Sequence, residues 1–164
     1  MLALESSVIQ YHQDADFPDS HFFQLQPIWE TIIQLAKEVL NQAPDVEALA
    51  VSSTNQRQGI VLLGRDGNSL IGFPHIENRG LEWESDMKDF DKVYGLTGRW
   101  ISTRFSALKL RGVKERQPHI REKISAFTSI SDWVGYECTG KLVFAQLVSK
   151  MGCFSKQHKR TIKI

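Results

Sequence analysis

Residues 59–73, Gly-Ile-Val-Leu-Leu-Gly-Arg-Asp-Gly-Asn-Ser-Leu-Ile-Gly-Phe, carry the clearest local fold signal of this 164-residue chain. Two apolar runs, at 59–63 and 69–73, flank the polar stretch 65–68. The Asp66-Gly67 pair between them favours a tight turn, because glycine tolerates a positive φ. The stretch therefore predicts a β-hairpin, and Pro74 ends its second strand because proline has no N–H to donate to a ladder.

The segments on both sides of the hairpin predict helices and strands in alternation. Residues 28–40 carry apolar side chains at helical spacing, with Pro27 placed for the first turn and Asn41 for the stop, and predict the clearest helix. Strands are predicted around Val8-Ile9, at 48–51 and at 126–130, and helical segments at 83–94, 105–113, 118–124 and 131–140, the last capped by Ser131 or Asp132 and closed by Gly140. This alternation predicts an α/β fold, with helices covering a sheet.

The composition places the chain among soluble globular domains. Hydrophobic residues make up 41% and charged residues 24%, which suits one core that needs no metal or disulfide. Cys138 and Cys153 do not form a disulfide framework, and the sequence has neither a secretory signal nor an apolar run of about 20 residues. We expect a cytoplasmic protein with reduced thiols and no membrane partner.

The net charge of +1 is distributed unevenly. Residues 1–140 carry a net charge of −5, and the last 24 residues carry +6. A basic end fits either a nucleic-acid-binding tail or a solvated terminus, but the acidic body lacks the broad basic face of a nucleic-acid binder, which favours the second interpretation. Residues 145–164 also show no sustained periodicity, so we expect a folded part at 1–144 and a basic irregular tail at 145–164.

Polar residues at the predicted strand ends are the candidates for chemistry. The sequence has no phosphate-binding glycine loop, no zinc-ligand spacing and no nucleophile elbow. It does place Asn-Gln-Arg-Gln at 55–58, and His75, Glu77 and Arg79 after the hairpin. A guanidinium beside an amide suits hydrogen bonding to adjacent hydroxyls of a polyol. The same residues also fit a loop whose side chains only satisfy backbone groups or solvent.

Five short motifs occur here in the order found in one family. They are residues 51–61, the Asp66-Gly67 hairpin, Thr97-Gly98, residues 105–110, and Ser131-Asp132-Trp133 with Thr139-Gly140. Over residues 5–143 the chain resembles the N-terminal domain of the FGGY carbohydrate kinases, which include glycerol kinase, xylulokinase and the autoinducer kinase. The resemblance implies a partial ribonuclease-H-like, actin-like ATPase domain, α/β in class, in which a mixed sheet has flanking helices. It also implies ATP-dependent phosphorylation of a sugar or polyol hydroxyl.

The resemblance further implies a substrate site. Arg57 and Gln58 fall on the Arg and Glu that hold the acceptor hydroxyls in glycerol kinase. His75 falls on the family's Trp after the hairpin, and Arg104 on its acceptor-contacting Tyr. A neutral Gln holds hydroxyls less strongly than a carboxylate does, which argues against glycerol as the substrate. The departures at His75 and Arg104 also point away from glycerol, and toward a more polar, phosphorylated or acidic acceptor.

Three parts of the family pattern are not found in this chain. Members carry a first β-hairpin whose loop positions phosphate and Mg²⁺, a catalytic Asp later in the domain, and an ATP-binding domain. We therefore expect residues 1–144 to be a partial domain lacking that hairpin, in a truncated or frame-shifted product whose residues 145–164 are non-native. We assign no catalytic or metal residue, and expect the chain alone to bind neither ATP nor Mg²⁺ and to be inactive.

An alternative function is a non-catalytic module that binds a sugar or another protein. In either case, a sheet without its first hairpin exposes an edge, and an exposed edge can pair with a second copy to form a homo-oligomer.

Overall fold

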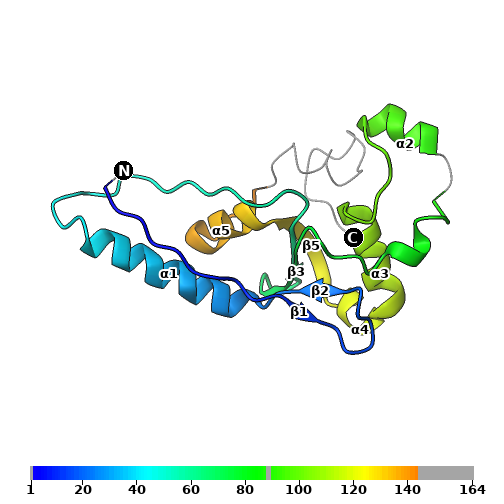
Figure 1. Cartoon of the computed structure of the whole chain (residues 1–164), viewed down its shortest axis with the longest axis horizontal. Helices are drawn as coiled ribbons and strands as arrows, with labels where there is room; N and C mark the ends of the chain where they lie inside the picture. The colour runs from blue at the N-terminus through cyan, green and yellow to red at the C-terminus, as the bar shows by residue number, and fades with distance from the viewer. Residues whose placement is uncertain (1, 88–89, 144–164) are drawn as a thin grey trace.

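The computed structural model describes residues 2–87 and 90–143. Along this part of the chain the elements are β1 (His12–Gln13), β2 (His21–Phe22), α1 (Leu25–Asn41), β3 (Ile60–Gly64), β4 (Ser69–Phe73), the 3-10 helix η1 (Leu81–Trp83), α2 (Phe90–Thr97), α3 (Ser106–Arg116), α4 (Pro118–Arg121), β5 (Ile124–Ser129) and α5 (Ile130–Thr139). Figure 1 shows α1 and α5 on one side of the sheet β4-β3-β5, and α3 and α4 on the other. The predicted α/β class with flanking helices is confirmed.

The central strand β3 contributes to both hydrophobic cores. Val61 and Leu63 belong to the core cluster beneath α1 and α5. Ile60 and Leu62 belong to the cluster that includes residues of α3 and α4. This alternation follows from the two-residue period of a strand, which sends successive side chains to opposite faces. All five β3 residues are buried, and every strand pairing among the described residues is antiparallel.

The hairpin and the first helix confirm their predictions. β3 and β4 are joined at Asp66-Gly67, where Gly67 has a φ of 82°. The helix predicted at 28–40 is α1, which begins three residues earlier than expected. The start moves because Leu25 is buried in the core, so packing extends the helix beyond the first position that sequence periodicity detects.

The start of α5 corrects a predicted cap. The helix begins at Ile130, and its cap is Ser129 rather than Ser131 or Asp132. The Ser129 hydroxyl accepts a hydrogen bond of 3.0 Å from the backbone N–H of Asp132. β5 passes directly into α5, so the last strand residue also caps the helix, while Gly140 ends it in the left-handed conformation as predicted.

Two predicted strands are wrong. Residues 48–51 form no strand, and the side chains of Leu49 and Val51 are 86% and 79% exposed. Val8 and Ile9 are also exposed, and the first strand is only His12–Gln13. An apolar run becomes a buried strand only where a neighbouring strand satisfies its backbone N–H and C=O groups, and no described strand pairs with either segment.

Two helical predictions are correct only in part. The predicted helix at 83–94 is replaced by η1 at its start and α2 at its end. The segment at 118–124 forms the short α4, and β5 already begins at Ile124. In the second case the buried pairing of Ile124 with Gly64 overrides local helix propensity.

The described residues contain no helix that is both long and apolar enough to cross a membrane. The predicted basic tail, residues 145–164, lies outside the described residues. The boundary at residue 144 therefore stays a prediction.

Candidate functional site

The loops that carry three of the predicted site residues lie at one end of the hairpin. Loop A, residues 54–59, precedes β3 and contains Arg57 and Gln58, and loop B, residues 74–80, follows β4 and contains His75. Ile60 at the start of β3 pairs with Phe73 at the end of β4. Antiparallel pairing therefore brings loops A and B side by side.

A hydrogen bond joins the two loops at the surface. The side-chain oxygen of Gln56 in loop A is bonded to Nδ1 of His75 in loop B. Gln56 also donates from Nε2 to the hydroxyl of Tyr11, at 3.1 Å. Gln56 was part of the polar run in the sequence, but it was not assigned to the site, and it is the residue that holds His75 in place.

Arg57 and Arg104 are exposed cations. Within residues 2–87 and 90–143, neither guanidinium group has a hydrogen bond or an ion pair. Arg104 lies two residues before α3, and that helix contacts loops A and B through Lys109. Lys109 thus connects loops A and B to the helix that follows Arg104, but among the described residues no hydrogen bond or ion pair joins Arg104 to Arg57, Gln58 or His75.

Gln58 has an unusual backbone conformation. Its φ is 64°, the only positive φ of a non-glycine residue in the described chain. A non-glycine residue held in this region costs on the order of 1–3 kcal/mol and persists only where its surroundings fix it. Such outliers cluster at binding and catalytic sites, so loop A is fixed in a shape that its own sequence does not prefer.

Lys109 provides that fixation from beneath the loops. It lies on α3 with its side chain fully buried. Its Nζ donates to the backbone oxygen of Gln58 at 2.8 Å and to that of Pro74 at 2.6 Å. One ammonium group therefore binds the backbones of both loops.

The Lys109 ammonium lies close to a buried ion pair. Glu77 and Arg79 in loop B are 0% and 1% exposed, with Arg79 Nε 2.5 Å from Glu77 Oε1. The other carboxylate oxygen of Glu77 accepts from the backbone N–H of His21, and the Arg79 guanidinium lies 3.9 Å from the centroid of the Phe73 ring. Loop B is therefore closely connected to β2 and β4 as well as to α3.

Close packing of α3 on loop B places Lys109 in this position. A β-carbon on Gly112 would lie 2.4 Å from Cγ of Arg79 and 2.5 Å from its backbone oxygen. A β-carbon on Gly80 would lie 2.1 Å from the backbone oxygen of Leu108. Only glycine at these positions allows the helix and the loop to come so near, which drives the Lys109 side chain into the interior.

Burial lowers the pKa of Lys109 to about 7. The charge of Glu77 acts in the opposite direction, and that of Arg79 adds to the lowering. Near neutral pH, Lys109 is therefore divided between its charged and neutral forms. Shifted pKa values of this kind concentrate at functional sites.

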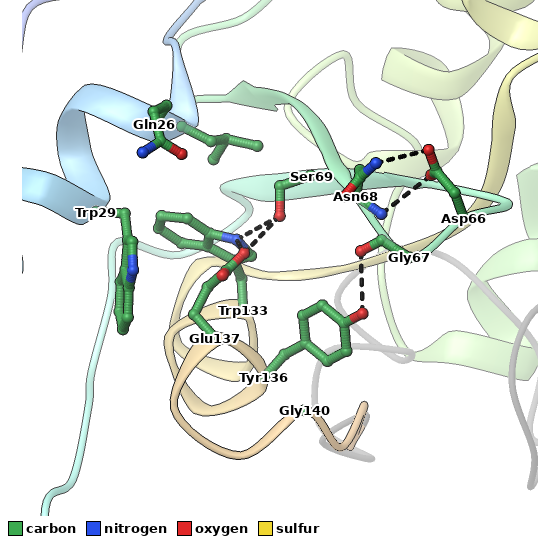
Figure 2. A pocket seen from close by; sticks show the side chains of 11 residues that line it. Gln26, Trp29, Asp66, Gly67, Asn68, Ser69, Trp133, Tyr136, Glu137 and Gly140 are labelled. Carbon is green, nitrogen blue, oxygen red and sulfur yellow. Dashed lines mark hydrogen bonds between the residues drawn. The ribbon is translucent and has the colours of Figure 1, made fainter.

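A polar pocket of about 510 Å³ lies at the other end of β3, between α1, the hairpin turn and α5. Figure 2 shows the Trp133 indole nitrogen and the Glu137 carboxylate converging on the Ser69 hydroxyl. Trp133 Nε1 donates to Ser69 Oγ at 2.8 Å, and Ser69 Oγ donates to Glu137 Oε1 at 2.7 Å. The Tyr136 hydroxyl donates to the backbone oxygen of Gly67 at 3.0 Å. These groups bond one another and attach α5 to the hairpin, so we assign the pocket to the fold rather than to the candidate site.

A larger groove of about 720 Å³ begins beside loop A. Its walls come from α1, from the start of α5 and from residues 7–12, and are mainly apolar. Gln56 lines both this groove and the contact with His75. Arg57, Gln58, His75 and Arg104 do not line it, so the predicted site residues lie outside this groove.

The sheet with a helical layer on each side defines the class of this protein as α/β, and the solved structures that resemble it have the actin-like ATPase fold. Solved structures share this fold. The xylulose kinase of Rhodospirillum rubrum matches with a TM-score of 0.80 and 16% identity, over 93% of this chain and 33% of that chain. Plasmodium falciparum glycerol kinase with ADP matches with a TM-score of 0.66 and 16% identity, over 90% of this chain and 36% of that chain.

The chain belongs to the FGGY family of carbohydrate kinases, whose N-terminal domain matches residues 3–157. The curated relatives include a Bacillus subtilis (strain 168) protein named "Putative sugar kinase YoaC", 44% identical over 144 residues, which are 88% of this chain and 30% of that protein. The autoinducer-2 kinase of Escherichia coli (strain SMS-3-5 / SECEC) is 30% identical over 137 residues, 77% of this chain and 25% of that kinase. The predicted family is confirmed, and the chain spans less than a third of the length of these two relatives.

Sequence reasoning missed Lys109 as a member of the site. Its signal was present, because Phe105, Leu108 and Lys109 are followed by Gly112 and Val113 at helical spacing. All five positions are buried, and the last four lie on one face of α3, which Phe105 precedes as its N-cap. A lysine on the apolar face of a helix indicates a buried amine that needs acceptors.

Proposed function

We propose that this chain forms the acceptor-holding part of an ATP-dependent sugar or polyol kinase. In this proposal Arg57, Gln58, His75 and Arg104 contact the hydroxyl groups of the acceptor. The observation that carries it is the joining of loops A and B at one end of the hairpin, by the Gln56 side chain and by Lys109. Membership in the carbohydrate kinase family supports the substrate class.

The exposed groups favour an acceptor that carries negative charge. A guanidinium presents a planar set of donors that can hold two oxygens at once, and it binds carboxylate or phosphate more strongly than hydroxyl. Arg57 and Arg104 have no carboxylate partner among the described residues, and the acidic residue of loop B, Glu77, is already bound by Arg79 and His21. We therefore infer a phosphorylated sugar or a sugar acid rather than glycerol.

ATP and Mg²⁺ are the phosphoryl donor and metal that the family implies. Among the described residues, no three or more His, Cys, Asp or Glu side chains are grouped so that they could hold a metal ion. We assign no residue of this chain to the nucleotide or to Mg²⁺. Our proposal is that the chain alone holds the acceptor without transferring phosphate.

Calorimetry on the purified chain tests acceptor binding. The panel contains pentoses, polyols, sugar acids and sugar phosphates, and we expect heat only from the anionic members. Arg57→Ala removes the binding, whereas Arg65→Ala is the matched control, because Arg65 is an exposed arginine on the hairpin turn at the opposite end of β3. Binding that is equally weakened by both substitutions, or by neither, contradicts the assignment of Arg57.

A coupled assay for ATP consumption tests whether the chain transfers phosphate. We expect no acceptor-dependent ADP release from the wild-type chain. Acceptor-dependent release that follows the chain through purification and is lost in Arg57→Ala would contradict the proposed inactivity.

A second candidate function is a non-catalytic interaction module that pairs with a second copy of the chain. The exposed apolar side chains at 46–51 and 2–9, on backbone that no described strand pairs, favour it. Sedimentation separates the two candidates. A stable monomer that binds an acceptor supports the first, and a dimer that binds no member of the panel supports the second.

A further inference from the structure

A single buried amine joins the two loops of the candidate site. Lys109 Nζ lies 2.8 Å from the backbone oxygen of Gln58 and 2.6 Å from that of Pro74. Each oxygen belongs to a residue next to one that we assign to the acceptor, because Arg57 precedes Gln58 and His75 follows Pro74. Movement of this amine would therefore move both sides of the site together.

We infer that Lys109 is a positioning residue for the acceptor site, holding loops A and B in the relative arrangement that lets Arg57, Gln58 and His75 meet one ligand. The part of this inference that concerns acceptor binding rests on the proposed function. The arrangement of the loops can be measured without any ligand.

The backbone of Gln58 gives the first reason for this role. Its φ of 64° is disfavoured for a residue with a β-carbon. The carbonyl of this same residue accepts from Lys109. The hydrogen bond offsets this strain. Without it, Gln58 would relax toward a negative φ, and the Arg57 and Gln58 side chains would turn away from their present positions.

The chemistry of Lys109 gives the second reason. A buried lysine is a poor choice for stability alone, since an apolar side chain of the same volume avoids the desolvation of an ammonium group. The charged groups near it are the carboxylate of Glu77, which favours the ammonium, and the guanidinium of Arg79, which opposes it. This cluster holds one anion, Glu77, and two cations, Arg79 and Lys109, so a lysine at this position lowers the stability of the fold. Such a residue is expected where it has a function at the site.

The test compares Lys109→Met with Lys114→Met in the full 164-residue chain. Methionine keeps most of the buried volume and removes the donor, and Lys114 is an exposed lysine on the same helix. Hydrogen–deuterium exchange of the peptides that cover loops A and B is measured without any ligand. We expect exchange about tenfold faster in both loops of Lys109→Met, because each loop loses one charge-assisted hydrogen bond, which corresponds to a factor of about this size. Exchange in β3 should be unchanged, and Lys114→Met should exchange like the wild type.

A second measurement uses only the wild-type chain, so it holds even if Lys109→Met does not fold. After correction for the intrinsic rate, exchange in loops A and B is compared at about pH 6 and about pH 8. We expect both loops to be more protected at the higher pH, because opening of the loops hydrates Lys109 and returns its pKa toward 10.5, so the open state is favoured at the lower pH, where the amine binds a proton. Equal protection at the two pH values, or loops in Lys109→Met that exchange like those of Lys114→Met, overturns the inference.

Acceptor binding is measured separately with the calorimetric panel. If the loops loosen in Lys109→Met and acceptor binding weakens about tenfold, the positioning role and the proposed function both stand. If the loops loosen and no panel member binds the wild type, the positioning role stands and the proposed function fails. If a panel member binds wild type and Lys109→Met equally, the positioning role fails and the proposed function stands.

Discussion

The buried amine of Lys109 predicts an alkaline rise in stability that one substitution removes. The pKa of Lys109 is about 7 in the folded chain, against 10.5 for a free lysine. Between these two values the unfolded chain binds the proton and the folded chain does not. Stability therefore rises with pH across this window, and the destabilisation is fully present below about pH 7.

The size of the effect follows from the two pKa values. Each pH unit inside the window changes the free energy of unfolding by about 1.4 kcal/mol, which gives about 5 kcal/mol over the whole window. Between about pH 8 and about pH 9.5 the wild-type chain should gain about 2 kcal/mol relative to Lys109→Met. The two carbonyl oxygens that lose their donor in Lys109→Met add a penalty that does not depend on pH. The titration of the amine is therefore identified by the slope of the free energy of unfolding against pH, and not by a constant difference between the two proteins.

Urea denaturation at several pH values measures this difference, with Lys114→Met as the control for titration of the other groups. We expect the Lys114→Met curve to run parallel to the wild type and the Lys109→Met curve to diverge from it. Parallel curves for all three proteins over this range would refute the reasoning, because they would mean that Lys109 keeps an ordinary pKa in the folded chain.

The packing of α3 on loop B and the exposed segment at 46–51 give two more predictions. Gly112→Ala should lower the free energy of unfolding by about 1–3 kcal/mol, because its β-carbon would lie 2.4 Å from Arg79 Cγ, whereas Gly135→Ala, with nothing within 4 Å, should raise it by about 0.5–1 kcal/mol in urea denaturation. Destabilisation of equal size in both variants would contradict the close approach of α3. Replacing both Leu49 and Val51 by Ser should reduce self-association in light scattering and leave the urea midpoint within about 0.5 kcal/mol of the wild type, because both side chains are exposed. Unchanged association would mean that another surface is responsible.

Local signals predicted the parts of the fold that depend on local sequence. The Asp66-Gly67 pair specified the hairpin, and the period of residues 28–40 specified α1, because turn conformation and helical amphipathicity are both properties of neighbouring residues. The strand predicted at 48–51 failed for the opposite reason. A strand needs partners that lie far away in the sequence, and composition alone does not supply them.

In the candidate site, too, the features set by local sequence could be predicted, and those set by distant residues could not. The polar runs at 55–58 and 75–79 were visible because they follow the apolar segments, and the structure joins them through Gln56. Lys109 lies within the helical segment predicted at 105–113, and it was not assigned to the site. Its burial depends on Gly112, because the absence of a β-carbon there lets α3 pack directly against Arg79 in loop B.

The two ends of β3 differ in what surrounds them. Loops A and B lie at one end, while the hairpin turn with the exposed Arg65 lies at the other. A fluorescent reporter or an affinity handle inserted at Arg65 would therefore be separated from the proposed acceptor site by the whole length of the strand. That turn is a suitable attachment point for immobilising the chain in ligand screens, because it leaves the proposed acceptor site on loops A and B open to solution.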